Sequence, residues 1–538
     1  MHRSQSGVLR ADLRLTCDGD PADESSTWAL YDPITLRSFE VPSLQAQVLR
    51  ALEEGRSQRE IAAELAADDD PEAAEAMLGE YLASLDDLAL LRGERSADEI
   101  RRLQREARRR ELKEDQRAAL GSMLARVTRV IPYYQDTLAP LGPEEQDHAI
   151  DRLPILSKDT LRAEFPRFLP SAEVISAMGS DAAWGSTSGT TGDRLQVVSS
   201  SAYSIDAWNR IYNFNAQVVR SLRKDRELRA ARLTSPICSG TECHVGRSVP
   251  YEERADDGEL LLETSMNILG DLDDMFENML KELHQFEPDY LIVNPSYLAA
   301  FARYIVRHGA TVPRISFVVT TYELLSRVHR KLIQTALSCP VWAGYASSES
   351  GPIAMECEHG RIHVSERDTL AEVRTNGRAA TAGETGRLVL TTLNKPLTPL
   401  LRYDSQDLVT VAPPCDCGRS ETDVFASLEG RLKDVVFSGA GLPVTPNQVD
   451  EAFFRAETSI CFYSLVQRGP RLFTANVVAE EGFDKPMRDR LTDSLHSLLG
   501  SDVRINVEAR HELRPEVSGK FRLAYQENPT GLSELFLP

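Results

Sequence analysis

The sequence predicts an α/β protein in which a small domain precedes a large sheet with parallel strands and a small α+β domain follows it. Beyond Asp151, apolar runs such as YLIVN and ISFVVTT alternate with helical periods such as YLAAFARYIV and VHRKLIQTAL. This order of strand, helix and strand is typical of a sheet with parallel pairings. From Gly386 the runs RLVLTTL and DLVTVA follow with little helix between them, which indicates a β-rich subdomain. We expect the large domain to span residues 96–429.

Residues 1–95 have the pattern of a separate domain. Residues 1–20 show no periodicity, and we expect them to fray. TWALYDPITLRSFEV predicts two short strands around a turn at Asp32, and three helical periods follow, the last of which begins at Pro71. Two strands and three helices in so short a segment predict a winged-helix-like domain.

The segment from Ser96 to Arg129 is rich in Arg, Glu and Ala, which predicts a long exposed helix or a helix pair. Ser96 and Glu99 have the spacing of a capping box at its start. At the other end of the chain, residues 430–538 predict a compact unit of mixed strands and helices.

Composition excludes several classes of partner. The chain has 538 residues, 42% of them hydrophobic and 27% charged, as expected for a globular protein. Its net charge of -21 disfavours nucleic acid or an anionic membrane as the main partner. No stretch approaches the roughly 20 apolar residues that cross a bilayer, and the N-terminus lacks a secretory apolar region, so we expect a cytoplasmic protein. The 8 cysteines are too few in this length for a disulfide scaffold.

A run of glycine and hydroxyl residues is the strongest candidate for a ligand-binding loop. It consists of Thr187, Ser188, Gly189, Thr190, Thr191 and Gly192. Its backbone N–H groups and hydroxyls can surround a polyphosphate such as that of ATP, although a flexible turn has the same composition. No lysine follows Gly192, so the run differs from the GxxxxGK[ST] phosphate loop.

Two further segments carry candidate ligand-binding side chains. Tyr345, Ser348 and Glu349 follow an apolar strand, and α/β proteins bind ligands where such strands end. Asp407 in RYDSQD offers a carboxylate that can accept hydrogen bonds from both hydroxyls of a ribose. From the residues alone, the first segment can equally be a plain turn at the end of a strand, and the second can be a surface charge pair.

Taken in order, these segments and their surroundings resemble the adenylate-forming superfamily of acyl-CoA synthetases, adenylation domains and luciferases. Within it the sequence is most similar to phenylacetate-CoA ligases. The matching segments are LPILSKDTLRAEFP, TSGTTG, YASSESGPIAMEC, GRLVLTTLNKPLTPLLRYDSQD, CDCGR and GRLKDVVFSGAGLPVTPNQVDEAF. The resemblance implies activation of a small carboxylic acid or peptide to an acyl-adenylate with ATP and Mg²⁺, then transfer to CoA, a carrier-protein thiol or an amine. It also implies that residues 430–538 form a mobile lid.

The resemblance implies a role for each candidate residue. The loop from Thr187 to Gly192 holds the phosphates of ATP, with Ser348 keeping the hydroxyl that relatives supply from threonine. The remaining implied roles are Tyr345 near adenine, Glu349 for Mg²⁺, Asp407 for the ribose, Arg431 near the nucleotide, Lys433 as the hinge of the lid and Lys520 as the catalytic lysine.

Besides Ser348, the sequence departs from the family in two places. Relatives usually have Lys-Pro after the phosphate loop, whereas this chain has Asp193 and Arg194, so Arg194 is a candidate for the missing cation. Tyr322 stands before Glu323 where relatives tend to have glycine, which leaves the identity of the acid open. Adenylation of a non-carboxylate oxyanion such as nitrite, and a non-catalytic scaffold that binds nucleotide or peptide, remain alternatives.

Cysteine and histidine residues form a candidate metal site. Cys357, Cys415 and Cys417 with His359 or His363 offer the ligands of a tetrahedral zinc site, although their spacing does not establish that they meet. A reduced surface cysteine pair with unrelated histidines is the alternative. Phenylacetate-CoA-ligase-like proteins can carry zinc at matching positions, and this resemblance favours His363.

The segment WALYDPITLRSFEVPSLQAQVLRALEEGRSQREIAAEL resembles the peptide-binding domains of the pyrroloquinoline-quinone-D (PqqD) type. The resemblance implies that residues 1–95 accept a leader peptide as an added strand. An ordinary winged-helix interaction or dimerisation domain is the alternative.

Overall fold

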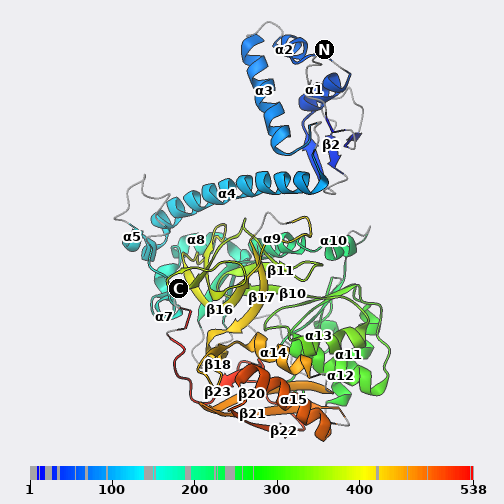
Figure 1. Ribbon diagram of the computed structural model, residues 1–538, viewed down its shortest axis with the longest axis vertical. Helices are drawn as coiled ribbons and strands as arrows, with labels where there is room; N and C mark the ends of the chain where they lie inside the picture. Colours follow the sequence, from blue (N-terminus) through cyan, green and yellow to red (C-terminus); the bar gives the residue numbers. More distant parts are fainter. Residues whose placement is uncertain are drawn as a thin grey trace. The chain divides into compact units, whose positions relative to one another are not determined.

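The chain forms two compact units in the computed structural model (Figure 1). One comprises Met1–Asp115 with Gly418–Glu421, and the other comprises Gln116–Cys417 with Thr422–Pro538. The structure describes residues 9–10, 13–18, 27–32, 37–54, 56–66, 71–91, 95–138, 150, 153–187, 195–222, 226, 228–236, 249–256, 258–270, 272–419, 423–456, 459–480, 483–533 and 535–536.

The first unit is a small antiparallel sheet with helices. Its strands, in the order β1-β2-β3, are β1 (Arg14–Asp18), β2 (Thr27–Asp32) and β3 (Arg37–Val41). The helices are α1 (Ser43–Glu53), α2 (Gln58–Ala66) and α3 (Pro71–Asp87), and α4 (Ala97–Val130) begins in this unit. Trp28, Leu30, Leu49 and Leu82 are buried together in the core. The two predicted strands and three predicted helices are therefore present.

The expectation that residues 1–20 fray is wrong for part of that range. β1 pairs with β2 along its whole length, from Arg14 opposite Tyr31 to Asp18 opposite Thr27. Only Leu15 and Cys17 of β1 pack against the core, and two alternating apolar positions are too few to stand out as a strand in the sequence.

Helix α4 is one continuous helix, as the composition of the segment allowed. The hydroxyl of Ser96 accepts a hydrogen bond from the Glu99 N–H at 3.2 Å, which satisfies one of the free donors of the first turn. Inside the first unit, the buried Asp32 carboxylate accepts hydrogen bonds from Arg10 and from Gln104 Nε2, the latter at 2.7 Å. A buried carboxylate needs such partners, and these contacts hold the start of α4 beside β2.

The second unit is built on one mixed sheet of 12 strands, and the predicted α/β class is confirmed. The strands that pair in parallel are β6 (Ala230–Leu233), β7 (Glu259–Leu261), β8 (Tyr290–Val293), β9 (Phe317–Thr320) and β10 (Val341–Ser347). The antiparallel strands are β11 (Gly351–Glu356), β12 (Ile362–Val364), β13 (Thr369–Thr375), β14 (Arg378–Ala379), β15 (Thr385–Thr392), β16 (Tyr403–Val411) and β17 (Val424–Arg431). The β-rich part that the sequence predicts is thus a continuation of the same sheet.

The antiparallel part contains a change of neighbours that sequence order does not suggest. After β12 the chain leaves its place in the sheet and forms β13, and β17 later returns to pair with β12. His363 of β12 lies opposite Val424 of β17 at this seam.

Helices cover both faces of the parallel strands. Val318 of β9 packs into a core with α11 (Asp273–Phe286), α12 (Pro295–His308) and α13 (Arg327–Leu337). Phe317 and Val319 pack on the other face with α9 (Ser201–Tyr212) and α10 (Ala216–Leu222). Strands buried on both faces are apolar throughout, which is why FVVT reads as a continuous hydrophobic run.

Short elements complete the large domain. They are α5 (Pro132–Leu138), α7 (Lys158–Ala163), η2 (Phe165–Phe168), α8 (Ala172–Ala177), η3 (Gly179–Asp181), β4 (Ala182–Ser186), β5 (Gln196–Ser200) and η4 (Tyr251–Glu253).

The C-terminal residues form a second sheet in the order β22-β21-β20-β23. Its strands and helices, with the short elements before them, are η5 (Leu432–Asp434), β18 (Val436–Phe437), β19 (Pro443–Val444), α14 (Pro446–Arg455), β20 (Ile460–Gly469), β21 (Leu472–Ala479), α15 (Lys485–Leu499), β22 (Arg504–Ala509) and β23 (Ala524–Gln526). Phe462 and Val478 join the core of the large domain, so this sheet belongs to the same compact unit. The domain limits at 95 and 429 stay predictions.

None of the described helices combines the length and the apolar character needed to span a membrane.

Candidate active site

A single cavity of about 740 Å³ brings the candidate residues together. It opens where the parallel strands end, between the large sheet and the C-terminal sheet. Residues that the sequence singled out line it, namely Thr187, Tyr345, Ser348, Glu349, Asp407, Arg431, Lys433 and Lys520. Segments separated by more than three hundred positions therefore share one chamber in the fold.

The start of the glycine and hydroxyl loop is held by a hairpin. The Thr187 N–H donates to the Leu195 carbonyl at 2.8 Å, and the Leu195 N–H donates to Thr187 Oγ1 at 3.0 Å. These bonds continue the ladder of β4 and β5 and bring the two ends of the loop together. Ser188, Gly189, Thr190, Thr191, Gly192 and Arg194 lie outside the described residues.

Tyr345 and Asp407 form one hydrogen-bonded unit. The Tyr345 hydroxyl donates to Asp407 Oδ2 at 2.7 Å, and Arg431 Nε lies 3.5 Å from Asp407 Oδ1. Arg431 is the direct cross-strand neighbour of Asp407, because β16 and β17 pair in that register. Burial and the adjacent Asp407 carboxylate hold the pKa of Tyr345 well above its usual value, so the phenol stays a donor.

Three side chains donate hydrogen bonds to Glu349. Its Oε1 is 2.8 Å from Lys158 Nζ and accepts a 3.2 Å hydrogen bond from the Tyr403 hydroxyl, and Lys395 Nζ donates to its backbone carbonyl. Burial raises the pKa of the Glu349 carboxyl, but the Lys158 ammonium, a backbone hydrogen bond and the Arg431 charge together hold that pKa below its ordinary value. Burial also lowers the pKa of Lys395 to about 8.

Sequence reasoning missed Lys158 as a cavity residue. It was part of the matching segment LPILSKDTLRAEFP, but nothing in that segment connects it with Glu349. One signal was available, since Ser157 caps α7 and Lys158 is therefore in the first turn. A cation at a helix N-terminus opposes the helix dipole, so its presence there indicates a partner outside the helix.

Lys520 reaches the cavity from a tight turn of the C-terminal domain. The Gly519 N–H donates to the Glu516 carbonyl at 2.8 Å and the Glu516 N–H donates to the Lys520 carbonyl at 2.9 Å. Gly519 has φ +77°, a conformation that glycine adopts without strain. Burial, followed by the Arg431 charge, lowers the pKa of Lys520 to about 8, although the carboxylates around the cavity act in the opposite direction.

Lys433 lies in η5, where the C-terminal domain begins. Its Nζ is 3.7 Å from Glu516 Oε2, and its carbonyl accepts a hydrogen bond from Arg522. Burial lowers the pKa of Lys433 below its usual value.

The cavity lining also contains Trp208 and Arg232, which the sequence did not single out, beside Tyr322, which it did. Tyr322 has φ +77°, an uncommon conformation for a residue with a side chain, and its hydroxyl lies 3.5 Å from Arg232 Nη1. Arg232 also donates to Glu259, at 3.0 Å from Nε.

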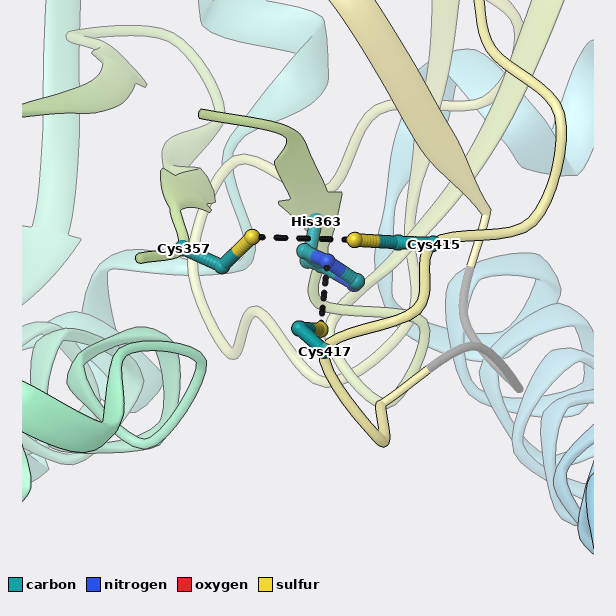
Figure 2. Close-up of side chains that lie close together, drawn as sticks. All are labelled: Cys357, His363, Cys415 and Cys417. Carbon is teal, nitrogen blue, oxygen red and sulfur yellow. Dashed lines mark hydrogen bonds between the residues drawn. The ribbon is translucent and has the colours of Figure 1, made fainter. Parts of the chain in front are cut away.

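The candidate metal ligands lie together, as Figure 2 shows, and none of the four lines the cavity. The Sγ atoms of Cys357 and Cys415 are 3.8 Å apart, and Cys417 Sγ is 3.3 Å from His363 Nε2. All four ligand atoms lie within 4.8 Å of one another, and His359 is not in this group. The hydrogen bond from Cys417 lowers the pKa of Cys357 to about 3, which favours the thiolate form that binds metals.

This donor set fits zinc. Four ligands around a tetrahedral Zn²⁺ with Zn–S distances of about 2.3 Å put two sulfurs ~3.8 Å apart, the separation found between Cys357 and Cys415. Cys357 follows β11, His363 belongs to β12, and Cys415 and Cys417 precede β17.

The fold is that of the adenylate-forming acyl-CoA ligases. Among solved structures, 2-hydroxyisobutyryl-CoA ligase in the postadenylation state, in complex with 2-HIB-AMP, matches with a TM-score of 0.60 at 15% identity. The match covers 77% of this chain and 89% of that chain.

In sequence, this chain is similar to phenylacetate-CoA ligases. The enzyme of that name from Thermus thermophilus is 27% identical over 381 residues, which are 67% of this chain and 79% of that protein. The enzyme of that name from Pseudomonas putida is 23% identical over 410 residues, 70% of this chain and 86% of that protein. No family model matches the chain. The predicted resemblance to AMP-forming ligases, and among them to phenylacetate-CoA ligases, is confirmed.

Proposed function

We propose that this protein joins a carboxylic acid to AMP with ATP and then transfers the acyl group to CoA or to another thiol or amine. The observation that carries the proposal is the enclosure of Lys520, Glu349 and the Tyr345–Asp407 pair in one cavity. In the first step, a carboxylate oxygen of the acid attacks the α-phosphorus, and the bond to the bridging oxygen breaks to release pyrophosphate. The Lys520 ammonium offsets the negative charge that builds up on the oxygens in the transition state.

Each group of the nucleotide has a candidate partner. We assign the ribose hydroxyls to Asp407, which Tyr345 and Arg431 already orient, and the adenine to the neighbourhood of Tyr345. The phosphates are assigned to the loop that begins at Thr187 and to Lys158, whose ammonium lies in the cavity. Lys158 supplies an ammonium group in place of the lysine that relatives have after the loop. Glu349 has the oxygen ligands that Mg²⁺ prefers, and its pairing with Lys158 would give way when the metal nucleotide enters.

The test is isotope exchange between pyrophosphate and ATP with a mixed panel of carboxylic acids. The proposal predicts exchange that depends on both Mg²⁺ and one acid of the panel. Absence of exchange with every acid, while nitrite supports it, would transfer the proposal to a non-carboxylate oxyanion. ATP binding without any exchange would favour the scaffold. Glu349, Arg431 and Lys520 lie around one cavity, and this set of charged groups argues against a non-catalytic scaffold.

CoA is the acceptor that we favour. The relatives from Thermus thermophilus and Pseudomonas putida are both named as CoA ligases. This chain matches more than two thirds of the length of each of them. We assign Lys433 as the hinge about which the C-terminal domain turns for this second step.

We also propose that Cys357, His363, Cys415 and Cys417 hold a structural zinc ion, on the basis of their distances. Protein prepared without chelator is expected to contain about one zinc per chain by elemental analysis. Cys415→Ser is expected to lose it and to melt several degrees lower, since the metal bridges β11, β12 and the approach to β17.

Cys17→Ser is the matched control, because Cys17 lies in β1 of the other compact unit. Equal metal content in the Cys415 and Cys17 variants would contradict the zinc assignment.

For the N-terminal unit we propose a peptide partner. The sheet order makes β3 an edge strand, and an edge strand can accept a further strand from a peptide. Removal of residues 1–95 is expected to abolish binding of leader peptides in a peptide-array assay while pyrophosphate exchange on small acids continues. Unchanged peptide binding by the shortened chain would reject this partner.

A further inference from the structure

Glu323 is a partly buried acid that the proposed chemistry does not use. It follows β9 at the carboxyl end of a parallel strand and lines the cavity. Tyr322 before it has φ +77°, so the chain turns sharply just where the Glu323 side chain leaves it. One carboxylate oxygen, Oε1, is enclosed and has no hydrogen-bond partner among the described residues, whereas the residue as a whole keeps some exposure to the cavity.

The other carboxylate oxygen of Glu323 bonds to the turn that carries Lys520. Its Oε2 accepts a hydrogen bond from the Phe521 N–H at 3.0 Å, although the two residues are 198 positions apart. Phe521 directly follows Lys520, so this bond fixes the backbone of the lysine from its C-terminal side. Burial raises the pKa of Glu323, while Ser296, the Phe521 N–H and the Lys520 charge act to lower it.

On the side of the turn away from Phe521, Gly519 packs closely against the large domain. A Cβ on Gly519 would lie 2.9 Å from the Cβ of Ser235, closer than ordinary contacts allow, and would touch the Tyr297 hydroxyl at 3.4 Å. Ser235 follows β6 and Tyr297 is in the first turn of α12. The turn therefore occupies a slot between strand ends, and Glu323 forms one wall of that slot.

Some polar groups at the docked turn lack hydrogen-bond partners among the described residues. Within the described chain, the Ser518 hydroxyl and the Tyr297 hydroxyl are buried without a hydrogen-bond partner, as is Glu323 Oε1. A buried polar group without a partner is less favourable than a hydrogen-bonded one. Such contacts favour a docked turn that the C-terminal domain can leave again, as a two-step ligase requires.

We infer that Glu323 is a positioning residue for the first half-reaction: it docks the C-terminal turn through the Phe521 N–H and, by its charge, orients the Lys520 ammonium. The inference rests on the proposed adenylation. Glu323 has no part in the second half-reaction, in which the turn has left its slot.

Two substitutions separate docking from charge. Glu323→Gln keeps an oxygen that accepts from the Phe521 N–H but removes the charge opposite Lys520. It is expected to lower the kcat of pyrophosphate exchange by about tenfold or more, with the KM for ATP within about twofold of wild type. Acyl transfer from a chemically prepared acyl-adenylate is expected to proceed at the wild-type rate.

Glu323→Ala removes both the charge and the acceptor. In the full-length chain without ligands, trypsin is expected to cleave the Lys520–Phe521 bond several times faster than in wild type, as followed by mass spectrometry. Glu323→Gln is expected to stay protected at that bond. Glu512→Gln is the matched control, because Glu512 is an acid of the same segment that pairs with Arg514 on the surface.

The outcomes distinguish this inference from the proposed function. A wild-type chain that exchanges pyrophosphate with none of the acids overturns the proposed function, and the trypsin result then stands by itself. A wild-type chain that exchanges pyrophosphate, together with a Glu323→Gln variant of equal kcat, overturns the role of Glu323 in orienting Lys520. Equal cleavage at Lys520–Phe521 in wild type and Glu323→Ala overturns its role in docking.

Discussion

Lys520→Ala is expected to slow pyrophosphate exchange by roughly a hundred- to a thousandfold, because one stabilising partner of a developing oxyanion is worth about 3 to 4 kcal/mol. The large value follows from the position of the ammonium. Lys520 is a partly buried side chain that lines the cavity, and the neighbouring Arg431 is held by Asp407 at 3.5 Å. No other described lysine reaches the cavity from the C-terminal turn.

The control for this variant is Lys485→Ala. Lys485 is an exposed lysine at the start of α15 in the same domain, with 87% of its side chain accessible. Exchange in Lys485→Ala should match wild type, and circular dichroism should be unchanged in both variants. A Lys520→Ala rate within about threefold of wild type would remove Lys520 from the chemistry.

Acidification is expected to destabilise the protein through His329. This side chain of α13 is buried against Phe462, with 4.6 Å between the ring centroids, and neither ring nitrogen has a hydrogen-bond partner among the described residues. Burial lowers its pKa to about 3, from an ordinary value near 6.5. Between these values the unfolded chain binds a proton that the folded chain does not, so the contribution to stability is largest above pH 6.5 and falls as the pH drops. The loss is about 1.4 kcal/mol per pH unit, or on the order of 5 kcal/mol over the whole range.

The measurement is the free energy of unfolding in urea at pH 7.5 and pH 5.5. His329→Leu removes the titrating group and the two unsatisfied nitrogens, so it should lose about 1.4 kcal/mol less than wild type on acidification. His308→Gln is the matched control, since the His308 side chain is about half exposed on α12. The same acid sensitivity in His329→Leu as in wild type would contradict the assignment to His329.

The motifs predicted the fold class and the meeting of distant residues for one physical reason. Strands β8, β9 and β10 run in parallel, so whatever follows their carboxyl ends must share one edge of the sheet. Tyr345 and Glu349 could therefore be expected near each other from the sequence alone. Asp407 joins them because β16 and β17 continue the same sheet, which was predicted as a separate β-rich part.

Other features left no trace that local patterns could report. β1 has only two core-facing residues, and Lys158 meets Glu349 across 191 positions. Glu323 was noticed only for the tyrosine before it, because its hydrogen bond to Phe521 depends on how the C-terminal domain packs. The roles of the loop residues after Thr187, of Mg²⁺ and of zinc stay predictions.

The return of β17 to β12 has a consequence for the newly made chain. As the protein emerges from the ribosome, β12 keeps an unpaired edge until β17 has been synthesised, a wait of seconds at about 5–20 residues per second. Cys357 and His363 precede this wait, and Cys415 and Cys417 end it. If the four residues hold zinc as proposed, an ion bound by the first two would gain its last two ligands only when the seam closes, so metal binding and the assembly of this part of the sheet would be coupled.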